Sequence, residues 1–140
     1  MGRYALVLHG GAGARRGVDY SREVPHMRGL VKVARERLAA GASALDVAVE
    51  TVVALEDSGL YVAGRGASPN LDGAYELDAS LMDGATQAAG AVAALQGFRN
   101  PILAARRVME ETPHVLLAGE GAAAFCRDQG LEPVADPETW

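Results

Sequence analysis

Apolar residues recur along the first part of the chain with the three- to four-residue spacing of amphipathic helices. This spacing predicts a helix over about residues 21–40, with an apolar face made of Val24, Met27, Val31, Ala34 and Leu38. Gly41 follows in a position that commonly ends a helix. Ser43 and Asp46 form a capping pair at the start of a second helix, which we expect to end near residues 57–59.

Short apolar runs bounded by turn-forming residues predict the strands. Residues 4–8 are expected to form a buried strand, because glycines follow them at once. Residues 74–82 and 88–95 are expected to form two further strands joined by a turn at Asp83-Gly84. Residues 114–118 are expected to form a short fourth strand.

Two more helices complete the predicted elements. Asn100-Pro101 predicts a helix start with an asparagine cap, and the helix extends to about residue 111. The last helix is expected over about residues 119–129. The order β-α-α-β-β-α-β-α, with hairpin-connected strands beside paired helices, predicts an α/β fold with an antiparallel sheet component. The 140 residues fit one compact domain or part of a larger one.

Composition and charge argue against several classes of function. The net charge is −5 and no basic stripe is present, so a nucleic-acid partner is not expected. No apolar run approaches the roughly 20 residues of a membrane span, and no leader pattern precedes the first strand, so we expect a cytoplasmic protein without a membrane partner. Cys126 is the single cysteine and is expected to be a small buried residue, with a reactive thiol as the alternative.

The most distinctive motif is the glycine loop, Gly10-Gly11-Ala12-Gly13, directly after the first predicted strand. Glycine at such a turn permits a positive φ and close approach of another group. Arg16 stands where a dinucleotide fingerprint needs its third glycine, and no Gly-Lys-Ser/Thr follows as in a P-loop. The loop therefore either holds an oxyanion through its backbone N–H groups or serves only as a structural turn.

Isolated titratable residues give weaker signals. His9 and His114 are expected as hydrogen-bonded core histidines rather than general bases, and His26 as a partly exposed helix residue. No two of these three histidines have the spacing of a metal-binding pair. Asp78 and Asp83 lie five residues apart on a strand and its turn, which disfavours an acid/base pair.

Residues 55–66, here called the curled loop, join the end of the second helix to a glycine-rich turn. A helix C-terminus that runs into such a turn exposes several carbonyl oxygens. A ring of these oxygens is able to hold a hard cation, and an ordinary surface loop is the alternative interpretation.

Six motifs occur in an order that resembles one known family. They span residues 8–13, 63–66, 76–84, 90–92, 100–106 and 113–121. In this order they resemble the α subunit of plant-type L-asparaginases, also called isoaspartyl peptidases. The resemblance covers nearly the whole chain, from Leu6 to about Leu131.

The resemblance implies a four-layer αββα sandwich of the N-terminal nucleophile hydrolases, of which residues 1–140 form the α-subunit half. It implies an autoproteolytically matured amidohydrolase that cleaves the β-amide of L-asparagine and β-aspartyl dipeptides. The threonine nucleophile belongs to a β subunit from the same precursor, and two αβ pairs form an (αβ)₂ heterotetramer. The threonines of this chain, at positions 51, 86, 112 and 139, do not follow the cleavage pattern Gly-Thr-Val-Gly. No catalytic residue and no organic cofactor is therefore expected in this chain.

The resemblance also assigns roles to residues outside the nucleophile. Gly10 and Gly11 match the glycine loop that adjoins the nucleophile. A structural sodium ion is implied in the curled loop, held by the backbone carbonyls of Leu55, Glu56, Ser58, Tyr61, Ala63 and Arg65. Val62 departs from the family, which usually has asparagine there, near the nucleophile.

Two other functions remain open, and the Val62 departure favours the first of them. One is a non-catalytic or slowly maturing relative that folds without efficient turnover. The other is a glycosylasparaginase-like enzyme that acts on glycosylated asparagine.

Overall fold

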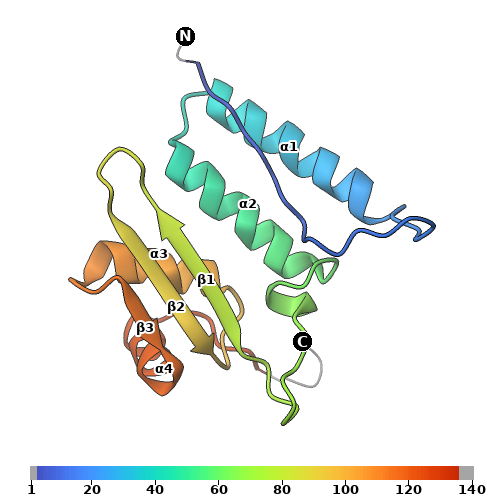
Figure 1. The fold of residues 1–140 in the computed structure, drawn as a ribbon. Helices are drawn as coiled ribbons and strands as arrows, with labels where there is room; N and C mark the ends of the chain where they lie inside the picture. The colour runs from blue at the N-terminus through green and yellow to red at the C-terminus, as the bar shows by residue number, and fades with distance from the viewer. Residues whose placement is uncertain (1–2, 136–140) are drawn as a thin grey trace.

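Two paired helices lie beside a small sheet that carries two helices of its own (Figure 1). The structure is a computed structural model, and it describes residues 3–135. Helix α1 (Glu23–Ala39) packs against α2 (Ala44–Ser58), and a short 3-10 turn, η1 (Gly64–Gly66), packs against the end of α2. No helix within residues 3–135 is both long enough and apolar enough to cross a bilayer.

The sheet contains three strands in the order β1-β2-β3. Strand β1 (Leu77–Met82) pairs antiparallel with β2 (Ala89–Leu95), and β2 pairs in parallel with β3 (Leu116–Ala118). The register shifts between Leu77 and Ala79, which marks a β-bulge. The predicted α/β class with an antiparallel component is confirmed by this arrangement.

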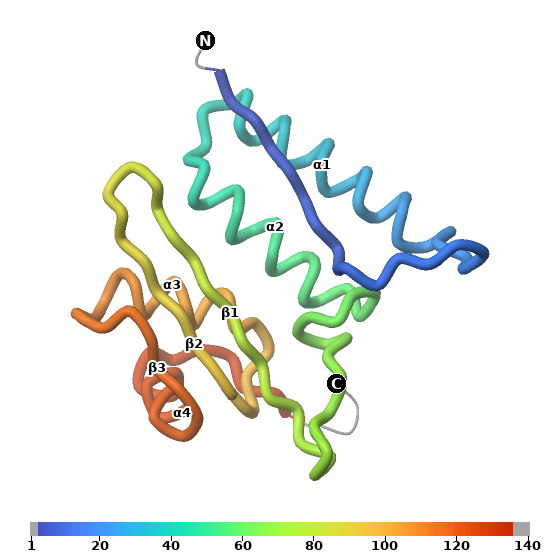
Figure 2. Tube along the Cα trace, in the orientation of Figure 1, coloured from blue at the N-terminus to red at the C-terminus, as the bar shows by residue number. Residues whose placement is uncertain are grey.

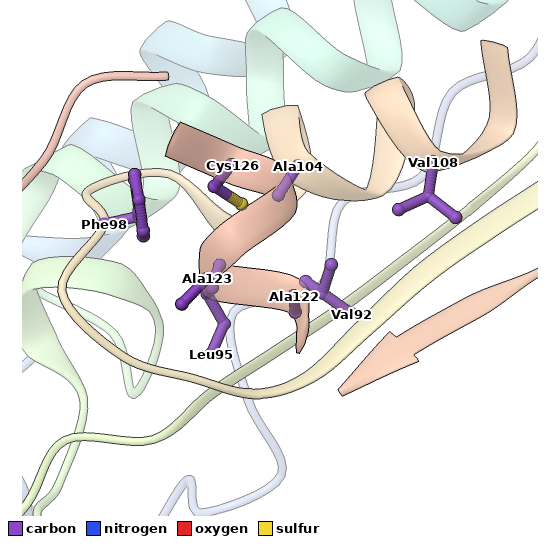
Figure 3. Packing of buried hydrophobic residues seen from close by; sticks show 8 residues of the cluster. All are labelled: Val92, Leu95, Phe98, Ala104, Val108, Ala122, Ala123 and Cys126. Carbon is purple, nitrogen blue, oxygen red and sulfur yellow. The ribbon is translucent and has the colours of Figure 1, made fainter. Parts of the chain in front are cut away.

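The two later helices pack against this sheet and enclose the main core. Helix α3 (Pro101–Glu111) packs across β1 and β2, and α4 (Gly119–Asp128) contacts β2 and β3. Figure 3 shows the apolar side chains between β2, α3 and α4, namely Val92, Leu95, Phe98, Ala104, Val108, Ala122, Ala123 and Cys126. Cys126 is fully buried, as predicted from its apolar surroundings in the sequence.

The predicted first strand is wrong in this structure. Residues 4–8 run as an extended segment along the two paired helices (Figure 2), but they pair with no strand among residues 3–135. Leu6 and Leu8 are half-buried, whereas Val7 is 90 % exposed. An apolar run specifies an extended backbone, but a strand also requires a neighbour for its N–H and C=O groups.

The apolar face predicted for α1 is only partly buried. Ala34 is buried and Met27 and Leu38 are half-buried, as expected for the face toward α2. Val24 and Val31 are exposed instead, because few other described segments cover this outer helix.

Local capping signals at the first two helices are confirmed. Ser43 Oγ accepts a hydrogen bond from the Asp46 backbone N–H at 3.0 Å and donates one to the Asp46 carboxylate at 2.7 Å. Gly41 follows the C-cap of α1 with φ +94°, a conformation that glycine adopts without strain.

Candidate functional site

The glycine loop follows the extended segment and lies against the side chain of Tyr61. A Cβ atom at Gly10 would lie 2.9 Å from Tyr61 Cε1 and 3.5 Å from the terminal carbon of Met27, so this position has no room for a larger residue. Gly11 has φ +119°, which favours glycine for a different reason. Both glycines are therefore required by the local structure, one by contact and one by backbone conformation.

The curled loop is wound tightly on itself. Helix α2 ends where Gly59 adopts φ +66°, and Ser58 Oγ donates a hydrogen bond to the Leu55 carbonyl at 2.8 Å. The Ala63 N–H donates to the Tyr61 carbonyl at 2.8 Å. The loop then returns to α2, because a Cβ atom at Gly64 would lie only 2.5 Å from Glu56 Cβ.

The two loops meet at one pocket of about 870 Å³. Of the predicted site residues, the pocket is lined by Gly10, Gly11, Leu55, Tyr61, Val62 and Ala63. Glu56, Ser58 and Arg65 do not line it, although they belong to the same loop. Val62 is 80 % exposed and lies on the wall of this pocket.

His9 and His114 are not core histidines. Both side chains are exposed among the described residues, and His9 lies on the wall of the pocket. Asp78 is also exposed, and its carboxylate accepts a hydrogen bond from the Ala94 N–H at 2.8 Å, where Ala94 has φ +49°. Asp83 accepts from the Thr86 hydroxyl at 2.7 Å, so the two aspartates have separate partners and form no acid/base pair, as their spacing predicted.

The described lining of the pocket contains no serine, threonine or cysteine. The three described threonines use their hydroxyls within their own elements: Thr51 donates to the Val47 carbonyl, Thr112 to the Val108 carbonyl, and Thr86 to Asp83. Thr139 lies outside the described residues. Among residues 3–135, no group of three or more His, Cys, Asp or Glu side chains is placed to hold a metal ion.

The carboxyl group of Glu56 is a feature that the sequence reasoning missed. It is 3 % exposed and accepts hydrogen bonds from the Ile102 N–H and from the Asn100 amide, both at 3.2 Å. Burial raises the pKa of Glu56 to about 7, although both hydrogen bonds oppose this rise. The carboxyl group thus connects the curled loop to the first turn of α3.

This contact also corrects the predicted cap of α3. Asn100 is the N-cap residue, but its side chain makes no capping hydrogen bond; its amide donates instead to Glu56 and to Asp57 at 3.0 Å. The Ile102 N–H in the first turn of α3 donates to Glu56 instead of to the side chain of the N-cap residue. The sequence held one signal for this contact: Glu56 is a charged residue within the apolar pattern at the end of the second helix.

The sequence of the chain was also compared with known proteins. A family described as Asparaginase matches residues 2–140. Isoaspartyl peptidase of Escherichia coli (strain K12) is 46 % identical over 140 residues, covering 96 % of this chain and 44 % of that protein. Plant-type L-asparaginase of Thermococcus kodakarensis is 46 % identical over 141 residues, with the same coverage of 96 % and 44 %. The chain therefore spans less than half the length of these relatives.

Proposed function

The chain belongs to the asparaginase family, and we propose on this basis that it forms the α-subunit part of an autoproteolytically matured amidohydrolase. The proposed reaction is hydrolysis of the β-amide of L-asparagine and of β-aspartyl dipeptides. Relatives named isoaspartyl peptidase and L-asparaginase support this reaction class. The cytoplasmic location remains a prediction from the sequence, which cell fractionation tests.

One observation carries the proposal: the glycine loop and the curled loop, far apart in sequence, line the same pocket. The described lining is mostly backbone and apolar side chains, joined by polar groups such as His9, Tyr20 and Glu23, and it contains no serine, threonine or cysteine nucleophile. Such a pocket is suited to receive a reactive group from elsewhere in the protein. This agrees with a chain that spans 44 % of the relative from Escherichia coli.

In the proposed mechanism the nucleophile is the N-terminal threonine of a β subunit from the same precursor. Its hydroxyl attacks the side-chain carbonyl of the substrate, and its own α-amine, with a pKa near 8, accepts the hydroxyl proton. The amine then returns this proton to the leaving nitrogen, and water hydrolyses the acyl-enzyme ester. Gly10 and Gly11 of this chain lie beside the reacting centre in this proposal.

The unpaired surfaces of the chain support a partner subunit. Residues 4–8 have an extended backbone without a strand neighbour in the described part of the chain, and Val7 is almost fully exposed. Met82 and Leu116, on the two outer strands of the sheet, are also exposed. We propose that a β subunit covers these groups, completes a four-layer αββα sandwich with residues 1–140, and assembles as (αβ)₂.

The curled loop fits the proposed sodium ion in its donor chemistry. The six carbonyl oxygens are neutral, and those of Leu55 and Glu56 lie at the negative end of α2. The carbonyls of Leu55, Tyr61 and Ala63 each accept one internal hydrogen bond, which leaves a second lone pair on each oxygen. A bound ion supplies positive charge that holds these oxygens together. We expect a higher melting temperature in sodium chloride than in tetramethylammonium chloride.

A second candidate is a non-catalytic or slowly maturing relative, and Val62 is the observation that favours it. The exposed Val62 side chain provides no amide at a position where plant-type asparaginases usually have asparagine. A glycosylasparaginase-like activity is the third possibility and differs in substrate size.

One assay panel separates these candidates. The complete gene product is incubated with L-asparagine, a β-aspartyl dipeptide or glycoasparagine, and product release is followed. Preferential turnover of the first two substrates supports the proposal. Preference for glycoasparagine selects the third candidate, and no turnover of any substrate by folded protein selects the non-catalytic relative.

A further inference from the structure

The side chain of Tyr61 lies between the glycine loop and α1. It is 9 % exposed, and its ring contacts Gly10 so closely that no Cβ atom fits there. The phenol oxygen lies 3.1 Å from His26 Nδ1 and donates a hydrogen bond to the Glu23 carbonyl at 3.3 Å. The ring is thus in contact with the loop at one side and bound to α1 at its hydroxyl.

Only one arrangement of protons satisfies both of these polar contacts together. A phenol has one proton, and Tyr61 gives it to the Glu23 carbonyl. His26 Nδ1 then donates its own proton to the phenol oxygen. The Tyr61 hydroxyl is thus hydrogen-bonded to two groups of the first turn of α1, the Glu23 carbonyl and the His26 ring.

Apolar packing alone does not require this arrangement. A phenylalanine at position 61 would bury the same ring against Gly10. The hydroxyl adds two directional contacts, and the half-buried His26 supplies one of them. Rigid support of this kind matters next to a reacting centre, because a displacement of about 1 Å is able to reduce a rate on the order of 100-fold.

We infer that Tyr61 and His26 are positioning residues that anchor the glycine loop to α1 through the Tyr61 hydroxyl. Neither side chain takes part in the chemical step. They hold Gly10, and with it Gly11, at a fixed distance from the nucleophile that the β subunit contributes. This inference rests on the proposed function. It adds the two side chains that hold the glycine loop in place.

The test uses the complete gene product with three single variants. Tyr61→Phe keeps the ring and the backbone carbonyl but removes the hydroxyl. His26→Ala removes the donor, whereas His26→Asn keeps an N–H group near the position of Nδ1. Tyr75→Phe, at an exposed site away from the pocket, is the matched control.

We expect kcat per cleaved molecule to fall on the order of tenfold in Tyr61→Phe and His26→Ala, with little change in KM. The double variant is expected to fall no further than Tyr61→Phe alone, because Tyr61→Phe already removes the contact that His26→Ala removes. His26→Asn is expected to recover most of the lost rate, and Tyr75→Phe to match the wild type.

Two outcomes separate this inference from the proposed function. If the wild-type protein is neither cleaved nor active, the proposed function fails and the anchor fails with it. If the wild type is active but Tyr61→Phe retains its kcat, the anchor alone is refuted. Additive losses in the double variant, or losses confined to melting temperature, likewise assign both residues a merely structural role.

Discussion

Replacing Gly90 with alanine tests the close packing between β2 and α3. A Cβ atom at this buried position would overlap the Ala105 carbonyl oxygen. It would also lie 2.5 Å from the Met109 backbone nitrogen and 2.7 Å from Met109 Cβ. Ordinary carbon contacts lie at about 3.5 Å, so the helix backbone must retreat by about 1 Å.

The predicted cost of this displacement is large for a single methyl group. Overpacking of a core costs about 1–3 kcal/mol, and we expect the upper end because backbone atoms of α3 are the obstacle. For a protein of this size, about 3 kcal/mol lowers the melting temperature by about 6–12 °C.

The assay is thermal unfolding of the complete gene product, with Gly84→Ala as the matched control. Gly84 has open space around its Cβ position and no positive φ, so its replacement is expected to leave the melting temperature nearly unchanged. Equal melting temperatures for the Gly90 and Gly84 variants would refute the close approach of β2 to α3.

Three further predictions concern single side chains. Because burial raises the pKa of Glu56 from 4.5 to about 7, ionisation of this one group should remove about 3 kcal/mol from the free energy of unfolding as pH rises from 4 to 8. Glu56→Gln should lack this loss. The free energy of unfolding is measured against pH in sodium-free buffer, and equal slopes for the wild type and the variant would contradict the prediction. Burial raises the pKa of Cys126 to about 11, so iodoacetamide at pH 8 should label this thiol only after unfolding. Mass spectrometry of native and denatured samples measures the labelling, and labelling of the native protein would contradict this prediction. Val62→Asn should accelerate maturation or turnover severalfold, since it returns an amide to the pocket; unchanged rates in a time course of cleavage and ammonia release would show that Val62 is not limiting.

Signals between neighbouring residues predicted the local structure well. Ser43 and Asp46 cap α2 as expected, and Gly41 ends α1, because both features depend on a few adjacent residues. Asn100 misled the prediction of the α3 cap. A local asparagine competes there with Glu56, a carboxylate 46 residues before Ile102 in sequence, and spacing along the chain does not reveal such a competitor.

The same limit explains the wrong strand and the incomplete site. Residues 4–8 carry the sequence of a strand, yet pairing depends on a neighbour that the described part of the chain does not supply. The anchor formed by His26 and Tyr61 joins residues 35 positions apart, and neither has a distinctive sequence context. Gly10 and Gly11 were found from sequence because glycine loops are recognisable without knowledge of their contacts.

The most direct test of the account is mass spectrometry of the complete gene product, purified and incubated until its mass distribution is constant. The account predicts two polypeptides, the second beginning with threonine, and amide hydrolysis that increases in step with cleavage. A single uncut polypeptide that hydrolyses L-asparagine would contradict it.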